Sequence, residues 1–205
     1  IDSFTAGHIP GAVFIDVPDK LSRSDTELHN MACSAEEFAQ QMGKFVKDGE
    51  HVVLYSSRHV MWATRVWWML RSFGYRGQLS VLDGGLKAWV AGGGALSTLP
   101  GETRNGSPLK VRELQQWSFV DQAHTLAALS NPAVVLVDSL KPAVYDGSKP
   151  SRYGRRGHIT TAVNVPYRDV VDERTGLFND ATQIVAAFRA AGIRLTGQPL
   201  SLLAY

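Results

Sequence analysis

An internal repeat constrains the fold of this 205-residue chain more than any other feature of its sequence. The segment GHIPGAVFI at residues 7–15 is echoed by GHITTAVNV at residues 157–165, an offset of 150 residues. The segments HVVLY at residues 51–55 and SLLAY at residues 201–205 share that offset of 150 residues. Self-similarity at a fixed period indicates repeated structural units, so we expect two copies of one domain.

Each copy carries a helix whose ends can be read from the sequence. Ser34 and Glu37 predict a capping box for the first helix, whereas Asp180 with Gln183 opens the second and Gly192 ends it. Apolar strands that alternate with helices indicate mostly parallel sheets covered on both faces. The predicted fold class is therefore α/β, with two doubly wound domains of which the second is incomplete. The predicted strands are residues 12–15, 52–55 and 79–82, then 134–138, 162–165 and 200–205.

A Gly-, Pro- and Asn-rich stretch from residue 92 to about residue 111 has loop chemistry without periodicity. We therefore expect a first domain at residues 1–95 that lacks its first strand, a linker at 96–115 and a second domain at 116–205. Because a domain rarely stops on a core strand, we expect the natural chain to extend beyond both ends. Mapping one copy onto the other predicts about 260 residues in all.

The composition narrows the classes of partner. Lys and Arg number 21 against 19 Asp and Glu, and this balance gives no reason to expect nucleic acid or a membrane. A lone cysteine, Cys33, excludes an internal disulfide and favours a reducing compartment, so the predicted location is the cytoplasm. The histidines show no metal-ligand spacing, and we expect neither a metal nor a cofactor.

Six short segments lie along the chain in a fixed order: GHIPGAV at 7–13, RVWWML at 65–70, LDGGLKAW at 82–89, VDS at 137–139, GHI at 157–159 and NVP at 164–166. In this order and spacing they resemble the tandem-domain rhodaneses, the thiosulfate and 3-mercaptopyruvate sulfurtransferases. The resemblance implies a transfer of sulfane sulfur through a cysteine persulfide, from a small anionic donor, thiosulfate or 3-mercaptopyruvate, to a thiophilic acceptor, cyanide or a thiol.

The resemblance also says where the nucleophile is expected. A cysteine that opens a strand-to-helix loop is favoured as a thiolate, because backbone N–H groups and the helix N-terminus stabilise an anion there. The first copy has Ser56 at this place and resembles the non-catalytic domain of the family. In the second copy the matching position follows Tyr205, so we expect the 205-residue chain to be inactive as a sulfurtransferase. Cys33, which precedes the Ser34 cap, is interpreted as a packing residue.

His8 has two interpretations. It matches a histidine that mercaptopyruvate sulfurtransferases are thought to use in proton transfer. Alternatively, His8 and His158 both fix the turn before a strand, since each copy has one.

A basic stretch contains the candidate donor-binding residues Arg152, Arg155 and Arg156, together with two lysines. It either binds an anionic donor or is a solvated basic loop. Leu140 and Val144 stand where rhodaneses often have arginines, so the basic stretch is the candidate substitute.

Two other functions remain open at this stage. One is a catalytically silent rhodanese-like protein that binds anions or partners, which the two missing arginines favour. The other is a phosphatase or arsenate reductase, because related folds lengthen the same loop to hold a tetrahedral oxyanion. The residues that follow Tyr205 discriminate among them: a cysteine with a glycine-rich loop favours sulfur transfer, and a longer loop that ends in arginine favours oxyanion chemistry.

Overall fold

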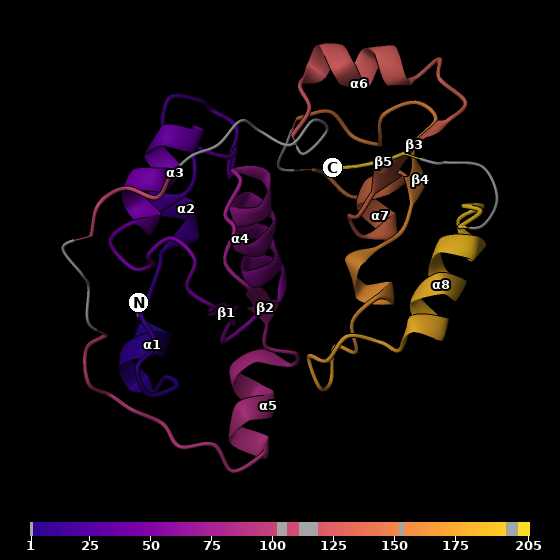
Figure 1. The fold of residues 1–205 in the computed structure, drawn as a ribbon. Coiled ribbons are helices and arrows are strands. Elements are labelled where there is room, and N and C mark those ends of the chain that lie inside the picture. Colours follow the sequence, from indigo (N-terminus) through magenta and orange to yellow (C-terminus); the bar gives the residue numbers. More distant parts are fainter. Residues whose placement is uncertain (1, 102–105, 111–118, 152–153, 196–200) are drawn as a thin grey trace. The chain divides into compact units, whose positions relative to one another are not determined.

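The computed structural model describes residues 2–101, 106–110, 119–151, 154–195 and 201–205. The chain divides into two compact units, Ile1–Ser118 and Phe119–Tyr205. Each unit contains a parallel sheet with helices packed on it (Figure 1).

The sheet of the first unit is a parallel pair of strands. β1 (Val52–Leu54) and β2 (Leu79–Val81) pair with Val53 opposite Ser80. Parallel strands need a crossover connection, which α4 (Met61–Ser72) supplies while contacting both strands (Figure 1). The other helices of this unit are α1 (Asp2–Ala6), α2 (Val17–Lys20), α3 (Ala35–Met42) and α5 (Gly85–Ala91).

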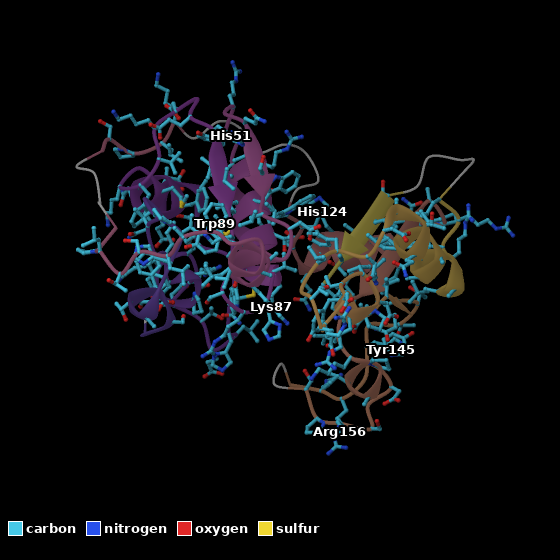
Figure 2. All side chains as sticks on the ribbon, turned by 90° about the horizontal axis from the view of Figure 1, so that it is seen from below. His51, Lys87, Trp89, His124, Tyr145 and Arg156 are labelled. Atoms are coloured by element: carbon cyan, nitrogen blue, oxygen red, sulfur yellow. The ribbon has the colours of Figure 1, made fainter. Side chains whose placement is uncertain are left out.

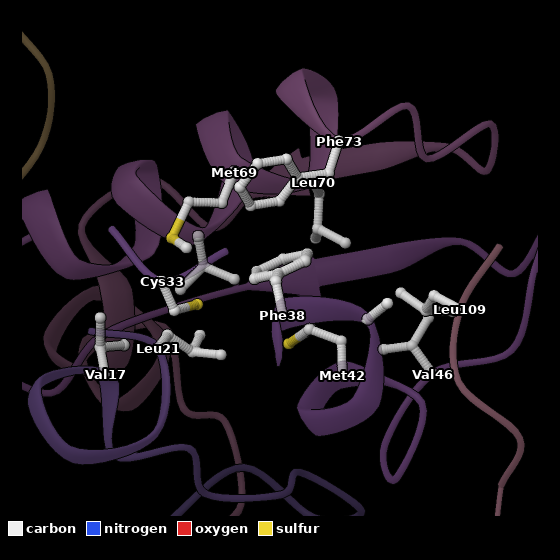
Figure 3. Close-up of a cluster of buried hydrophobic side chains, with 12 residues drawn as sticks. Val17, Leu21, Cys33, Phe38, Met42, Val46, Met69, Leu70, Phe73 and Leu109 are labelled. Atoms are coloured by element: carbon white, nitrogen blue, oxygen red, sulfur yellow. The ribbon is translucent and has the colours of Figure 1, made fainter. Parts of the chain in front are cut away.

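The core of the first unit lies between α3 and α4. Figure 3 shows Met69 and Leu70 of α4, with Phe73 just after it, packed over Phe38 and Met42 of α3. The rings of Phe38 and Phe73 have centroids 4.9 Å apart. Apolar residues at helical spacing on both helices thus meet in one cluster. Its buried members are Val17, Leu21, Cys33, Phe38, Ala39, Met42, Val46, Val66, Met69, Leu70, Phe73 and Leu109.

The predicted capping box at Ser34 and the predicted start of the second helix at Asp180 are both confirmed. The Ser34 hydroxyl accepts a hydrogen bond from the Glu37 N–H at 3.2 Å, and the Glu37 carboxylate accepts one from the Ser34 N–H at 2.9 Å. Asp180 and Gln183 make the same reciprocal pair at the start of α8 (Ala181–Ala190). Gly192 follows α8 with φ of 84°, a left-handed conformation that suits glycine and ends the helix.

The sheet of the second unit has three parallel strands in the order β4-β3-β5, which confirms the predicted α/β fold with parallel sheets. Successive side chains of β3 point to opposite faces. Leu136 packs with Ala128 of α6, whereas Val137 packs with Val165 and Ile193. The elements of this unit are α6 (Gln122–Ala128), β3 (Val134–Asp138), α7 (Pro142–Tyr145), β4 (Val163–Asn164), the 3-10 helix η1 (Tyr167–Asp169), α8 and β5 (Ser201–Ala204).

One predicted strand does not form. Residues 12–15 carry no strand, although the matching residues of the second unit form β4. The physical reason is the lack of a partner. β4 exists because Val163 pairs with Val137 of β3, and the described part of the first unit holds no strand in the place of β3.

Several residues of the predicted linker contact the rest of the first unit, among them Ser97 and Leu109. Ser97 and His8 exchange backbone hydrogen bonds of 2.8 and 2.9 Å. Leu109 is buried in the core, and its N–H donates to the Ala39 carbonyl oxygen at 3.0 Å. Both contacts lie within the compact unit that ends at Ser118.

Candidate active site

The carboxyl ends of β3, β4 and β5 meet at one edge of the second unit's sheet. Ligand sites of parallel α/β sheets lie at this edge. The N–H of Ser139, just after β3, donates to the Tyr205 carbonyl oxygen at 3.3 Å, and the Tyr167 N–H donates to the Ser139 carbonyl oxygen at 3.0 Å. Tyr205, at the end of β5, therefore lies at the carboxyl edge of the sheet, where the sequence predicts the reactive loop.

Tyr205 and Asp138 form the polar centre of this edge. The Tyr205 hydroxyl accepts a hydrogen bond from the Ile159 N–H at 2.8 Å. Asp138 is 1% exposed, and its Oδ1 accepts a hydrogen bond from the Leu140 N–H at 2.7 Å. Burial raises the pKa of Tyr205, and the charge and hydrogen bond of the Asp138 carboxylate raise it further.

The basic stretch runs from Lys141, the N-cap of α7, to the loop before β4. The side chains of Lys141, Lys149, Arg155 and Arg156 are exposed, and Figure 2 shows Arg156 at the outer tip of its loop. The Arg156 guanidinium donates to the Gly147 carbonyl oxygen at 3.5 Å, which leaves other guanidinium N–H groups for a ligand. Arg152 lies outside the described residues.

Leu140 and Val144 take up the places at which the resemblance expects arginines. Both side chains are half-buried, Leu140 two residues before the start of α7 and Val144 within it. An apolar side chain offers no hydrogen bond to an anion. In the described part of this stretch, the cationic side chains therefore come from Lys141, Lys149 and the two arginines of the loop.

The loop that follows β1 in the first unit is closed by its own hydrogen bonds. The Ser56 hydroxyl accepts from the Arg58 N–H at 3.2 Å, and the Ser56 carbonyl oxygen accepts from the Leu86 N–H at 3.1 Å. Gly85, with φ of 56°, lies against that carbonyl so closely that a Cβ would collide with it. The tight turn before α5 thus holds the loop at Ser56 in place.

His8 and His158 make matching contacts in the two units, although His8 is buried and His158 is exposed. His8 is 2% exposed, stacks on Phe4 at 3.7 Å, and places its Nδ1 2.9 Å from the Phe4 carbonyl oxygen. His158 stacks on Tyr145 at 3.7 Å with its Nδ1 2.8 Å from the Tyr145 carbonyl oxygen. This recurrence favours the turn-fixing interpretation, and the catalytic role of His8 stays a prediction.

Cys33 does not contribute to the candidate site. It is 6% exposed within the core of the first unit. Burial raises the pKa of its thiol, and the Glu37 carboxylate raises it further. A nucleophilic cysteine needs the opposite shift.

Two contacts at the site were not predicted from the sequence. In the first, the Tyr205 hydroxyl accepts a hydrogen bond from the Ile159 N–H, and in the second, the Tyr145 ring stacks on the His158 ring. A signal for the first was present, since Tyr55 and Tyr205 share the offset of the repeated histidines.

The described residues contain no group of His, Cys, Asp and Glu side chains suited to a metal ion. No helix among them has the length and hydropathy to cross a membrane.

The fold and the site define a class of protein: paired parallel α/β units in which a strand leads through a loop into a helix. Residues 1–92 match the Rhodanese-like domain family. The crystal structure of SseA, a 3-mercaptopyruvate sulfotransferase from Escherichia coli, matches with a TM-score of 0.80 and 30% identity over 94% of this chain and 71% of SseA. The chain belongs to the rhodanese family.

Curated relatives agree with this membership. The chain is 32% identical to human 3-mercaptopyruvate sulfurtransferase over 199 residues, which is 94% of this chain and 65% of the human protein. It is 29% identical to chicken thiosulfate sulfurtransferase over 201 residues, which is 97% of this chain and 68% of the chicken protein. The chain thus spans 65% of the length of its human relative, slightly less than two thirds.

Proposed function

We propose that this chain is part of a two-domain sulfurtransferase that moves sulfane sulfur through a cysteine persulfide, with the nucleophile in the position after Tyr205. One observation carries the proposal: Tyr205 stands at the end of β5 as Tyr55 stands at the end of β1, each hydroxyl accepting the N–H of the isoleucine in its GHI motif. The loop after Tyr55 opens on Ser56. The loop after Tyr205 is the remaining candidate for the nucleophile.

The chemistry needs an anion-stabilising loop. In the first unit the equivalent loop leads into α4, a helix of 12 residues. Backbone N–H groups and the positive end of such a helix favour a thiolate over a thiol. A cysteine placed there has a lowered pKa and reacts with sulfur electrophiles at neutral pH.

The transfer runs in two displacements. The cysteine thiolate attacks the outer sulfur of thiosulfate, forming an S–S bond while the donor's S–S bond breaks and sulfite leaves with the electron pair. With 3-mercaptopyruvate a C–S bond breaks instead, and the carbon takes up a proton as pyruvate leaves. Cyanide or a thiolate then attacks the terminal sulfur and restores the cysteine thiolate.

The donor is a small anion, so its binding site needs positive charge. We assign this role to the basic stretch that contains Arg152, Arg155 and Arg156, since a guanidinium matches the oxygens of thiosulfate or a carboxylate. We further propose that the protein works in the cytoplasm, because the single cysteine of these 205 residues favours a reducing compartment.

A transfer assay from thiosulfate to cyanide tests the proposal. The 205-residue chain is compared with the chain continued through the residues encoded after Tyr205. We expect turnover from the continued chain alone, and loss of turnover when its first cysteine after Tyr205 is changed to serine. Turnover by the 205-residue chain would refute the position of the nucleophile.

Leu140 and Val144 favour a second candidate, a catalytically silent protein that binds anions. Without a cationic side chain at these two positions, donor binding depends on the loop arginines. Sulfite and thiosulfate titrations, followed by calorimetry, separate the candidates when set beside the transfer assay. Binding without turnover by the continued chain supports the silent protein.

A further inference from the structure

The hydroxyl and backbone of Tyr205 tie together three segments that are far apart in the sequence. The hydroxyl accepts the N–H of Ile159, shortly before β4, at 2.8 Å. The Tyr205 N–H donates to the Val137 carbonyl oxygen at 3.1 Å, and its carbonyl oxygen accepts from the Ser139 N–H at 3.3 Å. Both the backbone and the side-chain hydroxyl of Tyr205 are therefore held at the carboxyl edge of the sheet.

Asp138 completes this arrangement. Its carboxyl group is buried, 1% exposed, and its Oδ1 accepts the Leu140 N–H at 2.7 Å. Burial raises the pKa of the Tyr205 hydroxyl, and the nearby Asp138 carboxylate raises it further. The Ile159 N–H therefore holds the phenol oxygen beside a buried carboxylate.

Tyr55 makes the matching contact in the first unit. Its hydroxyl accepts the Ile9 N–H at 3.2 Å, and the next residue is Ser56. The contact is thus a feature of the repeat. A change at Tyr55 removes the same kind of hydrogen bond beside a loop without a cysteine, which makes it a matched control.

We propose that Tyr205 is a positioning residue for sulfur transfer, its hydroxyl fixing the backbone from which the nucleophile's loop departs. This inference rests on the proposed function, in which the nucleophile follows Tyr205. The side chain and the nucleophile are neighbours on the chain, so freeing the phenol displaces the attacking sulfur. The cationic groups that bind the donor are unchanged, so donor affinity is retained.

The test uses the chain continued past Tyr205 and compares Tyr205→Phe with Tyr55→Phe. For Tyr205→Phe we expect kcat of thiosulfate-to-cyanide transfer to fall about tenfold, with KM for thiosulfate within about twofold, because small misplacement of reacting atoms slows the chemical step. For Tyr55→Phe we expect both constants to stay within about twofold. Amide hydrogen exchange at Ile159 and Ile9 reports whether each variant lost its own hydrogen bond.

The outcomes separate this inference from the function on which it rests. If the parent protein is active and Tyr205→Phe keeps its kcat, or both variants lose kcat equally, the positioning role is wrong while the function stands. A rise in KM with unchanged kcat contradicts it too. If the parent protein transfers no sulfur, the function and the positioning role both fail.

Discussion

At the scale of single residues, burial decides the chemistry of Cys33. The thiol lies in the core of the first unit, and burial together with Glu37 raises its pKa. We expect alkylation of the native 205-residue chain at about pH 8 to be at least about tenfold slower than in urea, because the thiolate is scarce and covered. Labelling followed by mass spectrometry measures both rates. Equal rates would show that Cys33 is accessible and reactive.

Phe38 carries a second prediction at this scale. Its ring is 2% exposed and packs against Phe73. We expect Phe38→Ala to lower the free energy of unfolding of the first unit by about 3–5 kcal/mol, through lost burial and the cavity left behind. All five tryptophans precede Phe119, so tryptophan fluorescence in a urea titration reports this unit.

The matched control for Phe38 is Leu99→Ala. Leu99 is 74% exposed in the same unit. We expect a change within about 0.5 kcal/mol, as for most surface substitutions. If the two variants were equally stable, Phe38 would not be a core residue.

At the scale of elements, the N-cap of α6 makes a pH-dependent contribution. The Asp121 carboxylate accepts the His124 N–H at 2.8 Å and lies 3.0 Å from the His124 Nδ1, and these hydrogen bonds lower the pKa of Asp121. The folded-state pKa lies below the ordinary value of about 3.9, so the cap is fully present above that value and is lost as the pH falls through the lowered pKa.

The His124 amide reports this loss. We expect its proton chemical shift to move upfield in an acid titration from about pH 6 to about pH 2, as the carboxylate takes up a proton and the hydrogen bond weakens. Asparagine also caps helices but does not titrate there. Asp121→Asn should therefore abolish this transition, and an unchanged transition in that variant would assign it to another group.

The elements also show what a sequence can predict. The starts of α3 and α8 follow from residues three positions apart, and both starts were predicted. Residues 12–15 share a motif with β4, yet they form no strand, since a strand depends on a partner that the motif does not encode. The Tyr205 contact with Ile159 escaped prediction for a related reason. It requires the register of β5 on β3, which only the folded sheet sets.

At the scale of the whole molecule, the two units differ in the residues that accompany their matching tyrosines, Tyr55 and Tyr205. The first unit holds an internally bonded loop at Ser56, whereas the second brings Asp138, Tyr205 and a basic loop into one unit. Family membership could be predicted from the motifs, but the sulfur donor could not, since Leu140 and Val144 stand where the resemblance leads us to expect arginines.

The most direct test of the proposed function is to locate the persulfide. The chain continued past Tyr205 is incubated with thiosulfate, digested without reductant and analysed by mass spectrometry. We expect the peptide that contains the residue after Tyr205 to gain the mass of one sulfur atom, and to lose it when cyanide is added. A sulfur adduct on Cys33, or on no peptide although the protein turns over, would contradict the proposed function.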